Sequence, residues 1–189
     1  MKRALALVIL AAALAAATVA LTQPAAPPAA TKAFVEPVSP PPYHTNGPAQ
    51  PINFSHQIHA GKLGMNCLYC HSSAEKSPIA NIPAVSTCMG CHKIARADRP
   101  EIIKLTGYSD RGEQIPWVEV YALPAYVKFN HKRHVKAGII CQDCHGPVET
   151  MAVVYQYPSL RMGWCVTCHR KNLDNPSFPA TMDCVVCHH

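Results

Sequence analysis

The hydrophobic pattern divides the chain into three parts. An unbroken apolar run, residues 4–21, follows the two cations Lys2 and Arg3. Residues 22–51 hold nine prolines and have the composition of an extended, polyproline-type segment. From residue 52 on, short apolar stretches alternate with cysteines and histidines. We therefore expect an anchor over residues 1–21, a proline-rich linker over 22–51 and one domain over 52–189.

The apolar run is long enough to cross a bilayer. Its 18 residues would make a helix of about 27 Å, against a hydrocarbon core of roughly 30 Å. A cleavable signal peptide with a processing site at Ala15–Ala17 has the same layout. We expect a retained transmembrane helix with the cations inside, which places the remaining chain outside the cytoplasm.

Two elements are predicted in the segment without cysteines, residues 93–128. A helix should start around Asp98–Glu101, where Pro100 favours the first turn, and end near Gly107. Residues 116–121 alternate weakly between apolar and polar, which is typical of a strand. The aromatic residues Trp117 and Tyr121 there either cover the cofactor or form a docking surface.

Ten cysteines and eleven histidines in 189 residues far exceed the usage of an ordinary globular domain. All ten cysteines fall into five copies of one motif, CxxCH. The five copies are Cys67/Cys70/His71, Cys88/Cys91/His92, Cys141/Cys144/His145, Cys165/Cys168/His169 and Cys184/Cys187/His188.

The CxxCH motif is typical of covalent haem c. On a helix its two sulfurs and its imidazole share one face, so the sulfurs can bond the porphyrin vinyl groups while the histidine binds the iron. Zinc sites need a second ligand pair, Fe–S clusters need chained cysteines, and disulfides do not need the histidine. We therefore predict five haems c with the CxxCH histidines as proximal ligands.

A second motif repeats ahead of the first and third CxxCH units. It is FxHxxH, with Phe54, His56 and His59 in one copy and Phe129, His131 and His134 in the other. Each copy precedes two CxxCH units, so the domain is expected to hold two two-haem modules plus a C-terminal haem. Because histidines at i and i+3 cannot both bind one iron, each pair should bridge two neighbouring irons as distal ligands.

Four distal histidines leave one of five irons without a sixth ligand. Candidates are Met151, Met162, His44 and His189. We favour Met151 or Met162, and a methionine would raise the potential of that iron. An open iron that binds substrate is the alternative.

The formal net charge of +6 does not indicate nucleic-acid binding, because the cations are scattered and five haems would add ten propionates. A domain of this length is too small to build a core around five haems from protein alone. We therefore expect a multihaem cytochrome c fold, mostly irregular with short α-helices around the CxxCH motifs and a haem-filled core, that is unfolded without haem.

Four longer strings indicate a family. They are NFSHQIHAG, CLYCHSSAEKSPIANIPAVSTCMGCHK, WVEVYALPAYVKFNHKRHVKAGIICQDCHGPVETM and MGWCVTCHR. Over nearly all of residues 51–188 the chain resembles the pentahaem cytochrome subunit of alternative complex III, a quinol-oxidising respiratory assembly, within the wider cytochrome c3/c7 group.

The resemblance implies an electron-relay subunit on the periplasmic side of the inner membrane. Its implied partners are an iron–sulfur protein, a polytopic quinol-binding subunit and a monohaem cytochrome c, with a soluble carrier or an oxidase as final acceptor. Two other functions stay open: a multihaem reductase with one open iron, and a free-standing membrane-anchored quinol dehydrogenase.

Overall fold

The structure is a computed structural model that describes residues 45–189. The predicted anchor and most of the predicted linker, including His44, lie outside the described residues. Residues 45–189 all belong to one compact unit. Within them, no helix is both long enough and apolar enough to cross a membrane.

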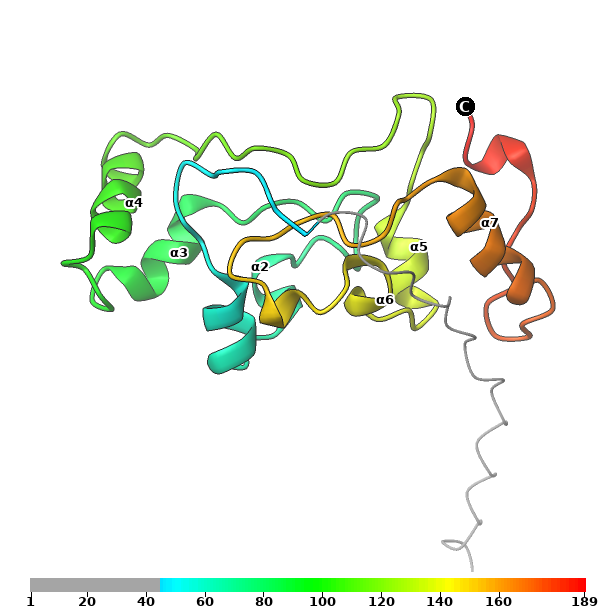
Figure 1. The fold of residues 1–189 in the computed structure, drawn as a ribbon, viewed down its shortest axis with the longest axis horizontal. Coiled ribbons are helices and arrows are strands. Elements are labelled where there is room, and N and C mark those ends of the chain that lie inside the picture. Colours follow the sequence, from blue (N-terminus) through cyan, green and yellow to red (C-terminus); the bar gives the residue numbers. More distant parts are fainter. Residues whose placement is uncertain (1–44) are drawn as a thin grey trace, which may run out of the picture. The chain divides into compact units, whose positions relative to one another are not determined.

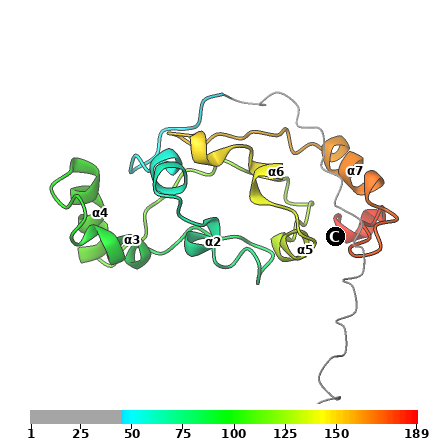
Figure 2. The same cartoon turned by 90° about the horizontal axis from the view of Figure 1, so that it is seen from below.

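The described chain consists of short helices joined by long irregular segments, as Figures 1 and 2 show, and residues 45–189 contain no strand. This confirms the predicted fold of short helices. In chain order the helices are the π-helix η1 (Gln57–Lys62), α2 (Cys67–Cys70), α3 (Val85–His92), α4 (Pro100–Asp110), α5 (His131–Lys136), α6 (Cys141–His145), the 3-10 helix η2 (Val148–Thr150), α7 (Met162–Lys171) and the 3-10 helix η3 (Cys184–Val186).

Polar caps start several of these helices immediately before a motif. The side chain of Asn66 accepts a hydrogen bond from the Leu68 amide at the start of α2. Asp183 caps η3 in the same way through the Val185 amide. Such caps satisfy amides that have no partner inside the helix, so they fix where each cysteine-bearing turn begins.

The predicted helix of the cysteine-free segment is confirmed as α4, which starts with Pro100 at its first turn. The predicted strand over residues 116–121 is wrong. The side-chain amide of Gln50 binds both backbone groups of Val118, donating to its oxygen and accepting from its nitrogen at 2.9 Å each. A side chain thus fills the place that a partner strand would take.

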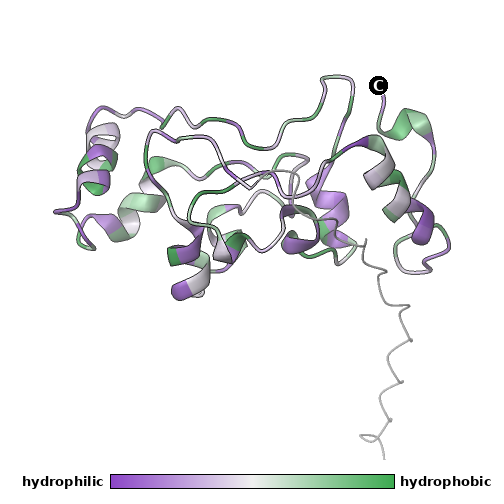
Figure 3. Ribbon diagram, in the orientation of Figure 1, coloured by the Kyte–Doolittle hydropathy of each residue, from purple (hydrophilic) through white to green (hydrophobic). Residues whose placement is uncertain are grey.

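The hydrophobic core lies at one corner, between α3 and α4. Ile52, Val85, Met89, Leu105 and Ile115 are buried together there. Elsewhere in the described residues, the buried apolar side chains are those of Ala74, Met151 and Pro158. In Figure 3 apolar and polar residues interleave along the helices instead of forming one interior layer. Most of the cysteine-bearing helices therefore lack a protein core to pack against.

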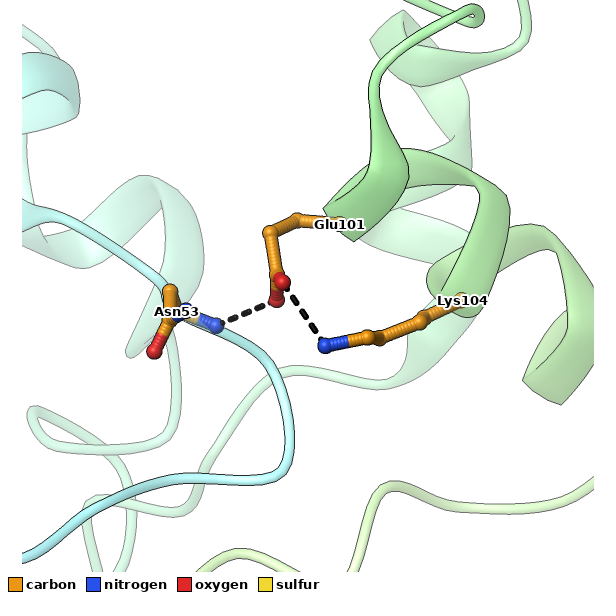
Figure 4. A network of polar contacts seen from close by, with 3 residues as sticks. All are labelled: Asn53, Glu101 and Lys104. Carbon is orange, nitrogen blue, oxygen red and sulfur yellow. Dashed lines mark hydrogen bonds and ion pairs between the residues drawn. The ribbon is translucent and has the colours of Figure 1, made fainter.

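A polar network ties the first segment to α4 (Figure 4). The Glu101 carboxylate accepts hydrogen bonds from the Asn53 amide and from Lys104 Nζ, both at 2.7 Å. Both bonds hold the pKa of Glu101 below its usual value, and the bond from Lys104 has the larger effect. The contact fixes the chain just ahead of Phe54 against the core corner.

Candidate functional site

Each CxxCH unit lies on or begins a helical turn. The units of His71, His92, His145 and His169 coincide with α2, α3, α6 and α7, and the unit of His188 begins on η3. All ten cysteines lie within the described residues, and none of them is paired in a disulfide. Among residues 45–189, no three His, Cys, Asp or Glu side chains converge to hold a metal ion by themselves. Each unit thus presents its own two sulfurs and one imidazole.

Three of the upstream histidines face the histidine of a CxxCH unit. The separations of the ring centroids and the angles between the rings are 6.1 Å and 67° for His59 and His92, 6.4 Å and 7° for His131 and His145, and 6.0 Å and 45° for His134 and His169. The FxHxxH histidines therefore pair one-to-one with CxxCH histidines.

The fourth upstream histidine, His56, lies beside His71. Burial lowers the pKa of His56 to about 4, and the nearby His71 is the neighbouring residue that lowers it most. Burial likewise lowers the pKa of His145 to about 4, with smaller contributions from His131, His71 and His56. At neutral pH these imidazoles are uncharged, which is the form that binds a metal.

The ring separations fit an iron between two imidazoles. With a metal–nitrogen bond of about 2.0–2.1 Å on each side and about 1.1 Å from each nitrogen to its ring centre, the two centres would stand roughly 6.3 Å apart. The observed 6.0–6.4 Å matches this value. The paired rings therefore have the spacing of the two axial ligands of a haem.

Hydrogen bonds orient most of these rings. Because a backbone carbonyl can only accept, each Nδ1 beside one must carry the proton, which leaves Nε2 with a lone pair for iron. The Nδ1–oxygen contacts are His59–Ser55 (2.9 Å), His71–Asn81 (2.7 Å), His92–Ala95 (2.9 Å), His131–Pro78 (2.9 Å), His134–Asn130 (2.8 Å), His169–Thr181 (2.6 Å) and His188–Tyr126 (3.3 Å).

His56 departs from this pattern. Its Nδ1 is buried and has no hydrogen-bond partner within the described part of the chain. Its counterpart in the repeat, His131, has one. The two copies of FxHxxH therefore differ in how firmly their first histidine is held.

The phenylalanine of FxHxxH packs against both histidines of its copy. Phe54 meets His56 edge-on at 4.9 Å and stacks on His59 at 4.4 Å. Phe129 meets His131 edge-on at 4.8 Å and stacks on His134 at 4.4 Å. The sequence repeat is thus also a structural repeat. Phe54 and Phe129 position the histidines of their copies. The sequence interpretation missed this role, although both phenylalanines belong to the motif.

Tyr121 supports the His145 unit. Its ring meets the His145 ring edge-on at 4.5 Å. Its hydroxyl lies 3.2 Å from the His145 oxygen and 3.0 Å from the Tyr155 oxygen, and it accepts a hydrogen bond from the Tyr157 amide at 3.2 Å. Tyr121 therefore packs against the His145 unit.

The histidine of the fifth unit lies beside the second FxHxxH copy. The His188 ring stacks on Tyr126 at 6.0 Å. Of the predicted sixth ligands, Met151 is 3 % exposed and its oxygen accepts from the Gln57 amide, whereas Met162 is 64 % exposed at the start of α7. His189 Nδ1 lies 3.2 Å from the Val185 oxygen.

The chain matches two sets of known proteins. The family described as cytochrome c7 and related cytochrome c matches residues 52–109 and 127–189. The chain is also 28% identical over 160 residues to the multiheme cytochrome c subunit of menaquinone reductase from Nitratidesulfovibrio vulgaris, and the match covers 74% of this chain and 76% of that protein. The family match includes all five CxxCH units and both FxHxxH copies.

Proposed function

Because the chain belongs to the cytochrome c7 and related cytochrome c family, whose members hold haem covalently, we propose that it binds five haems c and relays electrons through them. The pairing of each upstream histidine with one CxxCH histidine is the observation that carries the proposal. When bound, each haem supplies a one-electron ferric/ferrous couple.

The residues have separate tasks in this proposal. The ten cysteines hold the porphyrins, and His71, His92, His145, His169 and His188 bind the irons from the proximal side. His56, His59, His131 and His134 bind from the distal side. The carbonyls that accept from Nδ1 keep the Nε2 lone pairs directed at the irons.

Electron relay is favoured over substrate reduction for the four paired irons. Two imidazoles on one iron leave no position for a substrate. The reductase alternative is thus confined to the fifth iron, where we propose Met162 as sixth ligand because its helix, α7, also carries Cys165, a neighbour of Cys187.

We further propose that the chain works within a membrane assembly of the alternative complex III type, anchored by residues 1–21 with the haems on the periplasmic side. The similar N. vulgaris protein is named as a subunit of a menaquinone reductase. Both kinds of assembly exchange electrons with a membrane quinone, so a quinone-linked relay is the function they share.

The proposal is tested on the holoprotein. Intact mass should equal the polypeptide plus five haems, and electron paramagnetic resonance (EPR) should show low-spin ferric iron at the four paired sites. Purification in mild detergent should retain an iron–sulfur protein and a polytopic membrane protein. Zinc in place of haem would refute the relay, and a chain that elutes alone and oxidises quinol would refute the assembly.

A further inference from the structure

The first FxHxxH copy joins the units of His92 and His71. Its two histidines lie one turn apart, with His59 facing His92 and His56 beside His71. The thiols agree with this: burial raises the pKa of Cys70, and the nearby thiols of Cys67 and Cys91 raise it further. These two units are therefore direct neighbours.

The segments that follow the His71 and His145 units contact the two FxHxxH copies in two places. The segment after α6 supports the first FxHxxH copy, because the Gln57 amide donates to the Met151 oxygen at 2.9 Å and Gly61 lies against the Glu149 carbonyl. The segment after α2 supports the second copy in return. The amides of Lys132 and His131 donate to the oxygens of Ser77 and Pro78 at 3.1 and 3.0 Å.

The motifs themselves also meet there. The Cys67 side chain lies beside that of Cys141, and it raises the pKa of Cys141 further after burial. His71 and His56 both lie close enough to His145 to lower its pKa further. The His71 and His145 units are therefore in contact although the His92 unit separates them in the sequence.

The other two contacts follow chain order. The second FxHxxH copy joins the His145 and His169 units through His131 and His134. The C-terminal unit is held by the Lys128 amide, which donates to the Cys187 oxygen at 2.7 Å. Cys187 also lies close enough to Cys165 in the His169 unit to raise the pKa of Cys165.

From these contacts we infer that the five units stand in one row in the order His92, His71, His145, His169 and His188, with the His92 and His188 units at its ends. In both Figure 1 and Figure 2, α3, α2, α6 and α7 follow one another from left to right, and the red C-terminal turn lies next to α7. The order in space is thus not the order in the chain.

This inference rests on the proposed haem binding and makes that function more specific. An electron that passes between neighbouring units oxidises one ferrous iron and reduces the next ferric iron, and no bond is made or broken. Tunnelling rates fall exponentially with distance, so transfer between the His92 and His145 units has to use the His71 unit.

The order can be tested with a photoreductant fixed at one end. Ile94 is 91 % exposed and follows His92 by two residues. Because the native cysteines of the holoprotein are thioethers, an Ile94→Cys variant carries a single thiol for a ruthenium photoreductant. Under continuous illumination at low protein concentration, all five haems should be reduced rapidly, as counted by absorbance.

Two haem-deletion variants of the labelled protein distinguish the inferred order in space from the order in the chain. In the Cys67→Ala/Cys70→Ala variant, one of the four remaining haems should be reduced rapidly, because the His92 unit has lost its neighbour. In the matched Cys184→Ala/Cys187→Ala variant, all four should be reduced. Rapid reduction of all four haems in both variants would overturn the inferred order.

A second measurement avoids deletion variants that fail to mature. Anomalous diffraction at the iron edge from crystals of the unmodified holoprotein should place the His71 iron between the His92 and His145 irons. Adjacent His92 and His145 irons would overturn the order while leaving the relay intact. A protein without haem would instead overturn the proposed function.

Discussion

The imidazole rings of His131 and His145 lie 6.4 Å apart and within 7° of parallel, whereas those of His59 and His92 are inclined by 67°. The two pairs occupy different positions in the repeat. The His131/His145 pair contains the first histidine of an FxHxxH copy. The His59/His92 pair contains the second histidine of the other copy. In the proposed holoprotein, the repeat would therefore offer two irons the same pair of ligands in different orientations.

These orientations predict different EPR spectra. Parallel imidazole planes split the two π-symmetry d orbitals of ferric iron, and steeply inclined planes leave them nearly equal in energy. We expect a rhombic low-spin signal from the His131/His145 site and a strongly anisotropic one from the His59/His92 site. His131→Met should remove the first signal and His59→Met the second, and loss of the same signal in both variants would contradict the pairing.

The Nδ1 atom of His56 has no hydrogen-bond partner in the described part of the chain. We therefore expect that an external ligand replacing His56 binds equally well with or without a hydrogen-bond donor at that position. In His56→Gly and His131→Gly variants, added imidazole should restore low-spin iron. 1-Methylimidazole cannot donate from its methylated nitrogen. At the His131 site, where Nδ1 binds the Pro78 oxygen, it should bind more weakly by about 1 kcal/mol, roughly fivefold. At the His56 site the two ligands should bind alike, and an equal loss at both sites in optical titrations would refute the distinction.

The sequence predicted the chemistry of the site better than its arrangement. The CxxCH turns and α4 follow from local signals such as spacing, Asn66 and Pro100, and the structure has them as expected. The strand over residues 116–121 failed because the side chain of Gln50, far away in the sequence, takes the place of a partner strand.

The pairing of histidines could not be predicted for a similar reason. Whether His59 faces His71 or His92 depends on how the segments after α2 and α6 cross the two FxHxxH copies. Those crossings use backbone groups, such as the Pro78 and Met151 oxygens. Every residue type carries a backbone oxygen, so no sequence motif marks these contacts.

Removal of haem should unfold most of the described chain. The buried cluster of Ile52, Val85, Met89, Leu105 and Ile115 supports α3 and α4 alone, and isolated helices as short as α2, α5 and α6 are unstable in water. The chain expressed without haem maturation should lose most of its helical circular dichroism relative to the holoprotein. A haem-free chain with native helix content and a cooperative thermal transition would contradict this.

Gly146 should tolerate no side chain. It follows His145 with φ of 68°, and a Cβ there would overlap the Tyr157 ring. Gly138 has a φ of 82° but nothing within 4 Å of its Cβ position, so Gly138→Ala is a matched control for backbone strain. Gly146→Ala should lower the free energy of unfolding of the holoprotein by about 1–3 kcal/mol more than Gly138→Ala, the usual cost of overpacking. Equal losses in denaturant titrations would show that Tyr157 moves freely.

The sixth ligand of the fifth iron is predicted to be Met162 instead of Met151. Met151 is 3 % exposed beside η1, so its side chain is enclosed by protein, whereas Met162 is 64 % exposed on the helix that carries Cys165. A methionine-ligated ferric haem has a near-infrared charge-transfer band from sulfur to iron. Met162→Leu should abolish this band and lower the potential of one haem in five, because thioether ligation raises the potential. Met151→Leu conserves volume and should leave the band intact, so loss of the band in that variant alone would assign the ligand to Met151.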